Sequence, residues 1–332
     1  MSTFLTALSG SQPPHPPVWF MRQAGRSLPE YRSARAGIGM LESCLRPELA
    51  AELTLQPVRR HGVDAAIFFS DIVVPLRLAG VPVEIHSNVG PVFDRAYRDA
   101  ASIRELVSHR IEDAEPITEA VRILVRELGS TPLIGFAGAP FTLAAYLVEG
   151  RPSRDHLAAR ALMHTDPDSW HALLSWCASL AAGFLEIQVA AGARAVQLFD
   201  SWAGSLTRAD YVTHVAPHSR RVLERVDVPS IHFGTNTHHL LREFATIGDA
   251  LGVCYRTPLS EAIALFDGQV IVQGNIDPAL LAAPWPVLED HVRDIVQAGR
   301  GARAHIVNLG HGVPPGTDPD VLTRIVDLVH AL

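Results

Sequence analysis

The sequence predicts an α/β fold, a single-domain (β/α)8 barrel of the TIM type. Short apolar runs alternate with helical patterns along the chain, as expected of buried parallel strands joined by helices. The length of 332 residues is normal for one such barrel. Glycine and proline are scattered without a linker-like run, so residues 1–332 are expected to form one domain, with residues 1–15 as a poorly ordered N-terminal segment.

The predicted strands are eight, in the order Val18–Met21, Ala65–Phe69, Leu133–Phe136, Ala195–Phe199, Ser230–Phe233, Leu251–Cys254, Val270–Val272 and Ile306–Leu309. Apolar residues at helical spacing predict helices over Ile117–Leu128 and Trp170–Ala191. The last helix has the clearest signals, because Asp318 can cap it and Pro319 suits its first position. Before the third strand, Val81–Pro91 alternates weakly and predicts an inserted hairpin.

Polar or glycine-rich segments follow all eight predicted strands. They are Arg22–Arg26, Ser70–Ile72, Ala137–Thr142, Asp200–Trp202, Gly234–Asn236, Tyr255–Pro258, Gln273–Asn275 and Gly310–Gly312. Loops are usually polar, but that does not account for so many single Asp, Ser, His and Arg residues directly after apolar strands. Because such barrels build their sites at the C-terminal ends of the strands, the active site is predicted there.

The segment Val18–Arg26 is the most informative of these strand ends. It starts as an apolar strand and breaks into Arg22 and Arg26, which are separated by a small-residue turn ending in Gly25. An arginine binds a carboxylate through a planar fork of donors, and Gly25 lets the backbone approach a ligand closely. Two arginines on one tight loop predict a site for an acidic ligand. The alternative is a pair of surface arginines in ordinary salt bridges.

Four further residues are candidates, each with a structural alternative. Asp71 follows an aromatic strand, where a carboxylate is costly unless paired; a structural ion pair is the alternative. His311 lies between two glycines, which suggest a backbone that passes close to something; a core histidine is the alternative. Tyr146 is expected on the helix after the third strand, where packing is the role its spacing favours. Ser201 is weak alone, because no nucleophile elbow surrounds it.

The charged residues exclude several classes of function. The chain contains no lysine. Imine chemistry, including that of pyridoxal phosphate, and the usual phosphate-binding P-loop are therefore excluded. The net charge of −7 argues against nucleic acid as the partner. A polyanionic ligand must instead be attracted by a local cluster of arginines.

No metal site is expected from the spacing of cysteines and histidines. The three cysteines are far apart and include no CxxC pair: Cys44, Cys177 and Cys254. The spacing of His232, His238 and His239 matches no familiar site, and no acid or cysteine completes one. We read His238 and His239 as the start of a helix after the fifth strand.

The hydropathy of the chain predicts a cytoplasmic protein without a membrane partner. No apolar run approaches the roughly 18 residues of a membrane span. The segment 1–15 has neither a basic start nor a long apolar stretch, so it does not read as a secretory signal.

Several segments, spread over nearly the whole chain, together match one known family in its own order. They are PVWFMRQAGRSLPEYR from Pro17, LQPVRR, FSDIVVP, GFAGAPFTLAAYLVEG, FDSWAG, HFG, QGNIDP and NLGHGV. In these segments the sequence resembles the uroporphyrinogen decarboxylase family. The resemblance implies a single (β/α)8 domain, a homodimer with facing clefts and no cofactor. It also implies loss of carbon dioxide from the four acetate side chains of uroporphyrinogen III, giving coproporphyrinogen III.

The resemblance also implies which residues touch the substrate: Arg22, Gln23, Ala24, Gly25, Arg26, Asp71, Tyr146, Ser201 and His311. Asp71 and Arg22 are the expected catalytic residues. The carboxylate of Asp71 suits a ring that becomes cationic, and Arg22 and Arg26 suit the substrate carboxylates, with one of them a candidate proton relay.

Two sites depart from the family pattern, and the first is Trp202, where other members of the family have histidine. The family has Asp-Trp at the end of its sixth strand, where this chain has Cys254 and Tyr255.

Two other classes of function stay open on the sequence. A methyltransferase of the same superfamily needs a His-x-Cys and a distant Cys, which this chain lacks. A non-catalytic tetrapyrrole carrier would keep the arginines and tolerate loss of Asp71.

Overall fold

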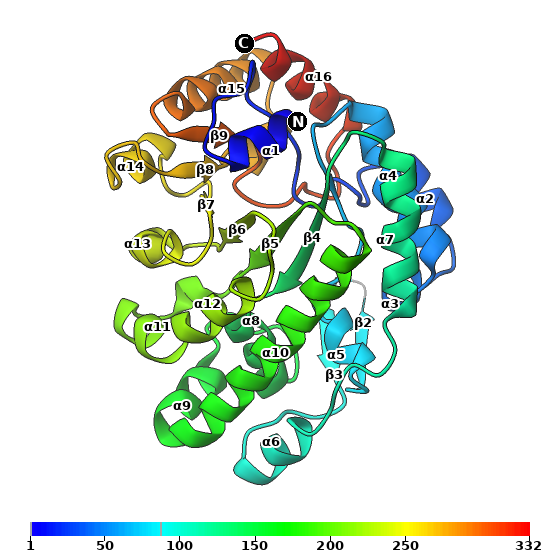
Figure 1. Cartoon of the computed structure of the whole chain (residues 1–332), viewed down its shortest axis with the longest axis vertical. Coiled ribbons are helices and arrows are strands. Elements are labelled where there is room, and N and C mark those ends of the chain that lie inside the picture. Colours follow the sequence, from blue (N-terminus) through cyan, green and yellow to red (C-terminus); the bar gives the residue numbers. More distant parts are fainter. Residues whose placement is uncertain (1, 87) are drawn as a thin grey trace.

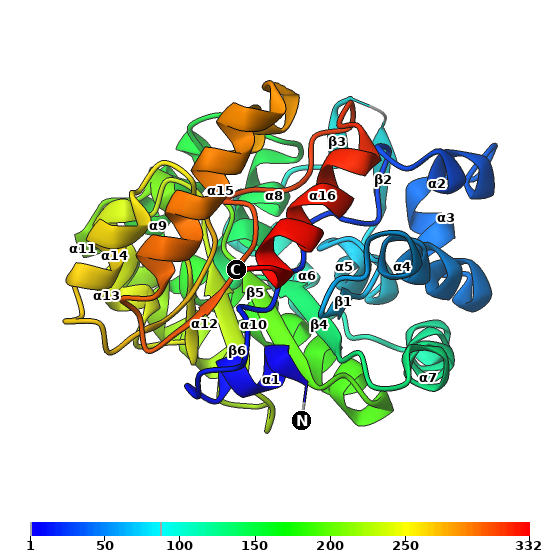
Figure 2. The same ribbon diagram turned by 90° about the horizontal axis from the view of Figure 1, so that it is seen from above.

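The computed structural model describes residues 2–86 and 88–332. In this part of the chain, seven strands form one parallel sheet in the order β1-β4-β5-β6-β7-β8-β9. These strands are β1 (Ala66–Ile67), β4 (Leu133–Gly138), β5 (Ala195–Phe199), β6 (Ser230–Phe233), β7 (Ala250–Gly252), β8 (Ile271–Gln273) and β9 (Ala304–Ile306). Figures 1 and 2 show the helices around the outside of the curled sheet. The predicted α/β class with a curled parallel sheet is confirmed.

The first predicted strand, Val18–Met21, is not a strand in the structure. Val18 makes one isolated parallel bridge to Val307, just after β9. On its other side the N–H of Asp64, just before β1, donates to the Val18 carbonyl at 2.9 Å. The segment thus contacts both edges of the seven-stranded sheet through a few hydrogen bonds and does not extend into a strand.

Side chains explain why this segment pairs so briefly. The N–H of Phe20 donates to the side-chain oxygen of Gln23 at 3.0 Å, and the N–H of Met21 donates to that of Asn308 at 3.0 Å. Both backbone groups are satisfied without a neighbouring strand, so the chain turns into the loop that carries Arg22.

Of the other predicted strands, Ala195–Phe199 and Ser230–Phe233 match β5 and β6 at both ends, and the rest hold with shifted bounds. The eighth predicted strand began too late: β9 ends at Ile306, after which the backbone makes only isolated bridges at Val307 and Leu309. The inserted hairpin is confirmed. Its strands β2 (Val83–His86) and β3 (Gly90–Phe93) pair antiparallel, with Val83 opposite Phe93.

The helices connect the strands and cover the outside of the sheet. The α-helices are α1 (Thr3–Leu8), α2 (Pro29–Ala34), α3 (Met40–Cys44), α4 (Pro47–His61), α5 (Val74–Leu78), α6 (Ala100–Leu106), α7 (Glu115–Leu128), α8 (Pro140–Glu149), α9 (Leu157–Thr165), α10 (Pro167–Ala191), α11 (Arg208–His214), α12 (Ala216–Leu223), α13 (Leu241–Phe244), α14 (Leu259–Ala264), α15 (Trp285–Gly299) and α16 (Pro319–His330). Short 3₁₀ turns are η1 (Ala203–Ser205), η2 (His238–Leu240) and η3 (Pro278–Ala282).

The helix signals read from the sequence are confirmed where they were strongest. Asp318 caps α16 by accepting from the Asp320 N–H at 3.0 Å, with Pro319 in the first position. Helices α7 and α10 occupy the predicted segments, and the start of a helix at His238 is the 3₁₀ turn η2. Proline at the first helical position costs no hydrogen bond, because that N–H lacks a partner in any helix.

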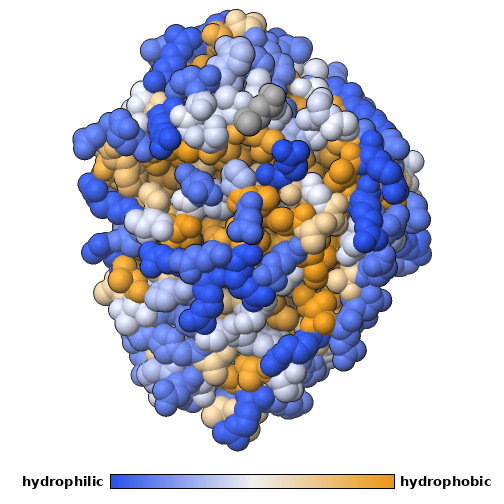
Figure 3. Space-filling model, in the orientation of Figure 1, coloured by the Kyte–Doolittle hydropathy of each residue, from blue (hydrophilic) through white to orange (hydrophobic). Residues whose placement is uncertain are grey.

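Helix α10 is a core helix. By length and composition alone it could cross a membrane, with a mean hydropathy of 1.5 over its most apolar window, but 61% of that window is buried inside the protein. The sequence predicted the helix itself, but the search for unbroken apolar runs did not show that it is apolar enough to cross a membrane, because polar residues interrupt its apolar stretch. Figure 3 shows the face seen in Figure 1, where patches of apolar residues toward the middle are crossed by a band of hydrophilic residues.

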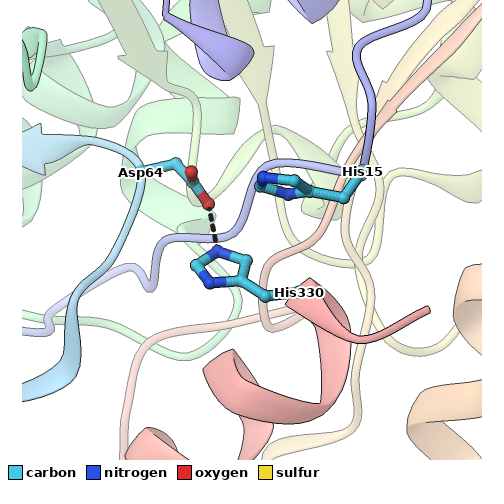
Figure 4. Close-up of side chains that lie close together, drawn as sticks. All are labelled: His15, Asp64 and His330. Carbon is cyan, nitrogen blue, oxygen red and sulfur yellow. Dashed lines mark hydrogen bonds and ion pairs between the residues drawn. The ribbon is translucent and has the colours of Figure 1, made fainter.

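The N-terminal segment, expected to be poorly ordered, contains helix α1 with Phe4 fully buried. Asp64, just before β1, joins this segment to the C-terminal helix (Figure 4). Its Oδ1 accepts from the Thr3 hydroxyl at 2.9 Å, and its Oδ2 accepts from the Val18 N–H and from His330 Nε2, each at 2.8 Å. We call this group the Asp64 junction. It orders both ends of the chain at the N-terminal end of the sheet.

Candidate active site

A cleft lies at the C-terminal ends of the strands, where the sequence predicts the active site. It holds about 630 Å³ of space, counting the part that is open to solvent. The residues that line it are Met21, Arg22, Ile72, Thr142, Tyr146, Phe199, Ser201, Trp202, Phe233, Thr235, His311 and Gly312. Four predicted site residues, from four separate segments of the chain, therefore share one cleft: Arg22, Tyr146, Ser201 and His311.

Arg22 is held in a strained backbone conformation at the edge of the cleft. Its φ is +61°, a region that residues other than glycine seldom occupy and that recurs at functional sites. A Cβ on Gly312 would lie 2.5 Å from Arg22 Cδ, so the missing side chain at Gly312 makes room for the arginine. Gly310 likewise lies against the backbone of Tyr255. These two contacts are the close approaches that the glycines around His311 suggest.

Neither arginine of the predicted pair forms a salt bridge with a described residue. The alternative of ordinary surface ion pairs is therefore not what the described structure contains. Both arginines are exposed, but Arg22 lines the cleft and Arg26 lies outside the lining, with its Nη1 3.5 Å from the side-chain oxygen of Asn88. The two arginines thus differ in position: one lies in the wall of the cleft and the other lies beyond it.

Asp71 lies after β1 beside Ile72, which lines the cleft. Its Oδ1 accepts from the Val73 N–H at 3.0 Å. Burial raises the pKa of this carboxyl, while the Val73 hydrogen bond and the charge of Arg22 oppose that rise. Asp71 has no ion-pair partner among the described residues, so the structural salt bridge considered for it is absent there. The carboxylate is partly satisfied and lies within electrostatic range of Arg22.

Tyr146 projects from α8 into the cleft wall. Burial, followed by the negative charge of Asp71, raises the pKa of its phenol, so the hydroxyl keeps its proton and can donate to an acidic ligand. Its ring centroid lies 4.0 Å from that of Trp202. The sequence favoured a packing role for this residue. The structure gives it both a packing contact and a place in the lining.

His311 presents one ring nitrogen to the cleft side of its loop. Its Nδ1 accepts from the Gly312 N–H at 2.8 Å, which assigns the proton of the neutral ring to Nε2. Burial, and then the charges of Arg22 and Arg256, lower the pKa of this imidazole. A neutral His311 with a proton on Nε2 can donate to a carboxylate without adding a charge.

The three remaining predicted residues, Gln23, Ala24 and Gly25, lie in the loop and not in the wall of the cleft. Gln23 is fully buried, and its Nε2 donates to the Ala65 carbonyl at 3.3 Å, which ties the loop to the start of β1. Ala24 and Gly25 are half-buried in the turn. None of these three lines the cleft, so only backbone groups of Gln23 are left to face a ligand.

Sequence reasoning missed part of the wall. Trp202 carries no sequence signal for a role, yet it lines the cleft against Tyr146. Thr142 and Thr235 also line it, and the hydroxyl of Thr235 donates to the Ser201 carbonyl at 2.6 Å. All three follow predicted strands directly or within a few residues. Their position after a strand was the available signal, but residue type alone did not separate them from ordinary loop residues.

A buried acid and histidine lie behind this wall. Asp200 and His232 are both fully buried, with Asp200 Oδ2 3.7 Å from His232 Nε2. Asp200 Oδ1 accepts from the Thr142 hydroxyl at 3.3 Å, and His232 stacks on Phe244 with ring centroids 3.9 Å apart. These groups support the segment that carries Ser201 rather than face the cleft.

Comparison with known proteins identifies the family. The family model described as "Uroporphyrinogen decarboxylase (URO-D)" matches residues 1–332. The chain belongs to the uroporphyrinogen decarboxylase family. A protein named uroporphyrinogen decarboxylase from Arthrobacter sp. (strain FB24) is 61% identical, over 100% of this chain and 97% of the relative. One from Salinispora tropica is 57% identical, over 100% of this chain and 90% of the relative.

Solved structures agree on the fold. A methyltransferase from Methanosarcina mazei superposes with a TM-score of 0.83 and 16% identity, covering 99% of this chain and 97% of the other. A B12-independent methionine synthase from Shewanella sp. W3-18-1 gives a TM-score of 0.58 at 13% identity, over 85% of this chain and 87% of the other. At such identities the likeness concerns architecture alone.

The departure from the family pattern lies beside the site. Cys254 is 2% exposed, as expected of a cysteine acting as a small apolar residue. Its carbonyl accepts from the Asn275 amide at 3.1 Å, and the Tyr255 N–H donates to the Gly310 carbonyl at 3.3 Å. Cys254 does not line the cleft. The pair holds the β7 end against the loop of His311.

Proposed function

We propose that this protein is a carboxy-lyase that removes carbon dioxide from the four acetate side chains of uroporphyrinogen III and releases coproporphyrinogen III. The observation that carries the proposal is the convergence of Arg22, Tyr146 and His311 on one cleft beside the unpaired Asp71. The match to the family model over the whole chain supports the same reaction.

The reaction needs a sink for two electrons. When the bond between the acetate methylene and its carboxylate breaks, the bonding pair stays on the methylene carbon. The chain has no lysine to form an imine with the substrate. A proton added to a neighbouring pyrrole carbon turns the ring into a cationic iminium, which accepts the pair. A proton then adds to the methylene carbon and the ring carbon releases its own, so that one hydrogen replaces one carbon dioxide.

Charge in the cleft suits this sequence of steps. In this proposal the carboxylate of Asp71 faces the pyrrole N–H groups and stabilises the ring while it is positive. Burial that raises the pKa of Asp71 also strengthens its interaction with a nearby cation. Preorganised charge of this kind commonly contributes more to catalysis than any other effect. Arg22, which lines the cleft and carries a proton, is the candidate relay.

The other residues hold and orient the remaining carboxylates. Arg22 binds a substrate carboxylate from the wall of the cleft, and Arg26 binds another from outside the lining. The hydroxyls of Tyr146 and Ser201 and the Nε2 proton of His311 donate to acetate or propionate groups. Backbone groups of Gln23, Ala24 and Gly25 line the approach. No cofactor takes part in the scheme.

The finer features of the family are part of the proposal. We propose that residues 17–19 complete a closed eight-stranded barrel, that residues 1–332 are one domain, and that two copies form a homodimer with facing clefts. The protein is proposed to act in the cytoplasm, on a small molecule, without nucleic acid or membrane as partner. The net charge of −7 supports the exclusion of nucleic acid.

Turnover of uroporphyrinogen under reducing, anaerobic conditions tests the function. We expect coproporphyrinogen to form without added metal or cofactor and at an unchanged rate after exhaustive chelation. A tetrapyrrole carrier would bind the substrate and release it unaltered. A methyltransferase would lose activity on chelation and regain it with a specific metal. Either of those results would overturn the proposal.

A further inference from the structure

Histidines gather on the outer helices, away from the cleft. His164 lies in the last turn of α9, His214 ends α11, and His171 and His218 lie on α10 and α12 beside them. Asp210 of α11 completes the group. Figure 1 shows these four helices packed together at one side of the molecule. None of the five residues lines the cleft, and the decarboxylation scheme uses none of them.

Three members of this group have the spacing of metal ligands. One ligand atom each from His164, Asp210 and His214 lies within 4.8 Å of the others. His164 Nε2 is 3.3 Å from Asp210 Oδ1. Two ligands that each bind a zinc ion at about 2.1 Å with tetrahedral angles lie about 3.4 Å apart. Asp210 and His214 are four residues apart on one helix, so they lie on the same face.

Two further histidines, His171 and His218, lie next to these three ligands. His171 Nε2 lies 3.5 Å from His214 Nδ1, and His171 Nδ1 lies 3.2 Å from His218 Nε2. A ligating histidine usually has its second nitrogen held by such a partner, which sets the ring orientation and the tautomer. With Nδ1 of His214 facing His171, Nε2 of His214 is the nitrogen left for a metal.

We propose that His164, Asp210 and His214 bind a divalent transition metal ion, with zinc as the reference ion, and so join α9 to α11. Imidazole nitrogens with one carboxylate oxygen are donors that suit zinc, nickel and copper rather than magnesium or calcium. His164 is exposed and the other two are half-buried, so the ion enters from solvent. Three protein ligands leave the fourth position to water.

The other grouping of histidine and aspartate in the described chain is a poorer candidate and serves as the comparison. In the Asp64 junction, Oδ2 already accepts two hydrogen bonds and Oδ1 a third. A metal there would have to displace His330 from the carboxylate. In the proposed site, Asp210 has only the contact to His164 among its side-chain oxygens.

Zinc titration of the full-length chain, stripped beforehand with a chelator, tests the site. A chromophoric competitor reports affinity, and cobalt in place of zinc reports geometry through its visible bands. The test variants are His164→Gln and His214→Gln. The controls are His238→Gln, an exposed histidine on η2, and His330→Gln in the Asp64 junction. Decarboxylase turnover of each variant shows that it is folded.

We expect wild type to bind one zinc ion and to gain thermal stability from it. His164→Gln and His214→Gln should each weaken binding at least about tenfold, and His238→Gln and His330→Gln should not. Turnover should stay unchanged in all four. Equal affinity in wild type and both test variants would overturn the proposal. So would a loss of affinity confined to His330→Gln, because that result would place the ion at the Asp64 junction.

Discussion

The aspartates at the two ends of the curled sheet differ in how many hydrogen bonds their carboxylates accept. At the N-terminal end, Asp64 accepts hydrogen bonds from Thr3, Val18 and His330. At the C-terminal end, Asp71 accepts one, from a backbone N–H, and has no ion pair among the described residues. Fully satisfied polar groups hold a fold together, whereas a carboxyl with a perturbed pKa beside a cleft points to function. Each end can therefore be altered without the other.

The largest expected effect is on turnover at the C-terminal end. Asp71→Asn should lower kcat/KM by about 10²–10³, the usual cost of removing one preorganised electrostatic group, because the cationic ring loses its counter-charge. Asp64→Asn should leave kcat/KM within about twofold of wild type, once folded protein is compared. Steady-state kinetics on both variants checks this. Retained turnover in Asp71→Asn would mean that the carboxylate is not catalytic.

The contribution of Asp71 to the free energy of unfolding is expected to depend on pH. The folded state raises the pKa of Asp71, so it binds this proton more tightly than the unfolded chain does. The contribution of Asp71 to the free energy of unfolding is therefore present below the ordinary carboxyl value of about 3.9 and is lost as the pH rises through the raised pKa. Urea unfolding across that window should show this decline in wild type and not in Asp71→Asn.

Arginine replacements should come next in size. Arg22→Ala should cost about 2–5 kcal/mol of substrate binding, as expected when a buried carboxylate loses its charged partner. Arg26→Ala should cost less, because Arg26 does not line the cleft. Lysine at either position should restore substrate binding only in part, since lysine lacks the bidentate fork of donors. Binding measured by titration decides the order. Wild-type binding by both alanine variants would make these arginines irrelevant to the ligand.

At the N-terminal end the expected loss is in stability. Asp64→Ala removes the acceptor of three hydrogen bonds and should lower the free energy of unfolding by about 2–4 kcal/mol. The matched control is Asp290→Ala, an exposed aspartate on α15, which should change it by less than about 0.5 kcal/mol. Chemical denaturation measures both. If the two variants lose the same amount, the junction contributes nothing particular to the fold.

A smaller effect is expected from the loop that crosses Arg22. Gly312→Ala places a Cβ 2.5 Å from Arg22 Cδ and should displace that side chain, raising KM several-fold with little change in thermal stability. Gly316→Ala is the control, since a Cβ there meets nothing within 4 Å and its φ is ordinary. Kinetics of both variants tests the contact. An unchanged KM in Gly312→Ala would show that Arg22 adapts freely.

The smallest effect on turnover is expected where the family pattern breaks. The double change Cys254→Asp with Tyr255→Trp should alter thermal stability by no more than a few kcal/mol, in either direction, and turnover less. The reason is that Cys254 is buried outside the cleft lining, and Asp71 already supplies the carboxylate. The informative contrary result is an inert wild type that gains decarboxylation from the double change. The aspartate would then be catalytic.

Local patterns in the chain are sufficient for much of this architecture. The alternation of strands and helices, the cap of α16, the inserted hairpin and the segments that form the cleft all follow from periodicity, capping residues and strand ends, which involve neighbours in sequence. The same patterns place Arg22, Tyr146, Ser201 and His311 at one end of the sheet, because each of these residues follows a predicted strand.

Contacts between distant residues account for the rest. Val18–Met21 reads as a strand, yet the Asn308 side chain accepts the Met21 N–H. Helix α1 is ordered because Thr3 and His330 meet on Asp64. Partners that are hundreds of residues apart leave no periodic trace, because their approach depends on how the whole sheet curls. The sequence pattern therefore predicts which segments come together. Their packing in the folded protein determines which backbone groups pair and which carboxylate remains available to a ligand.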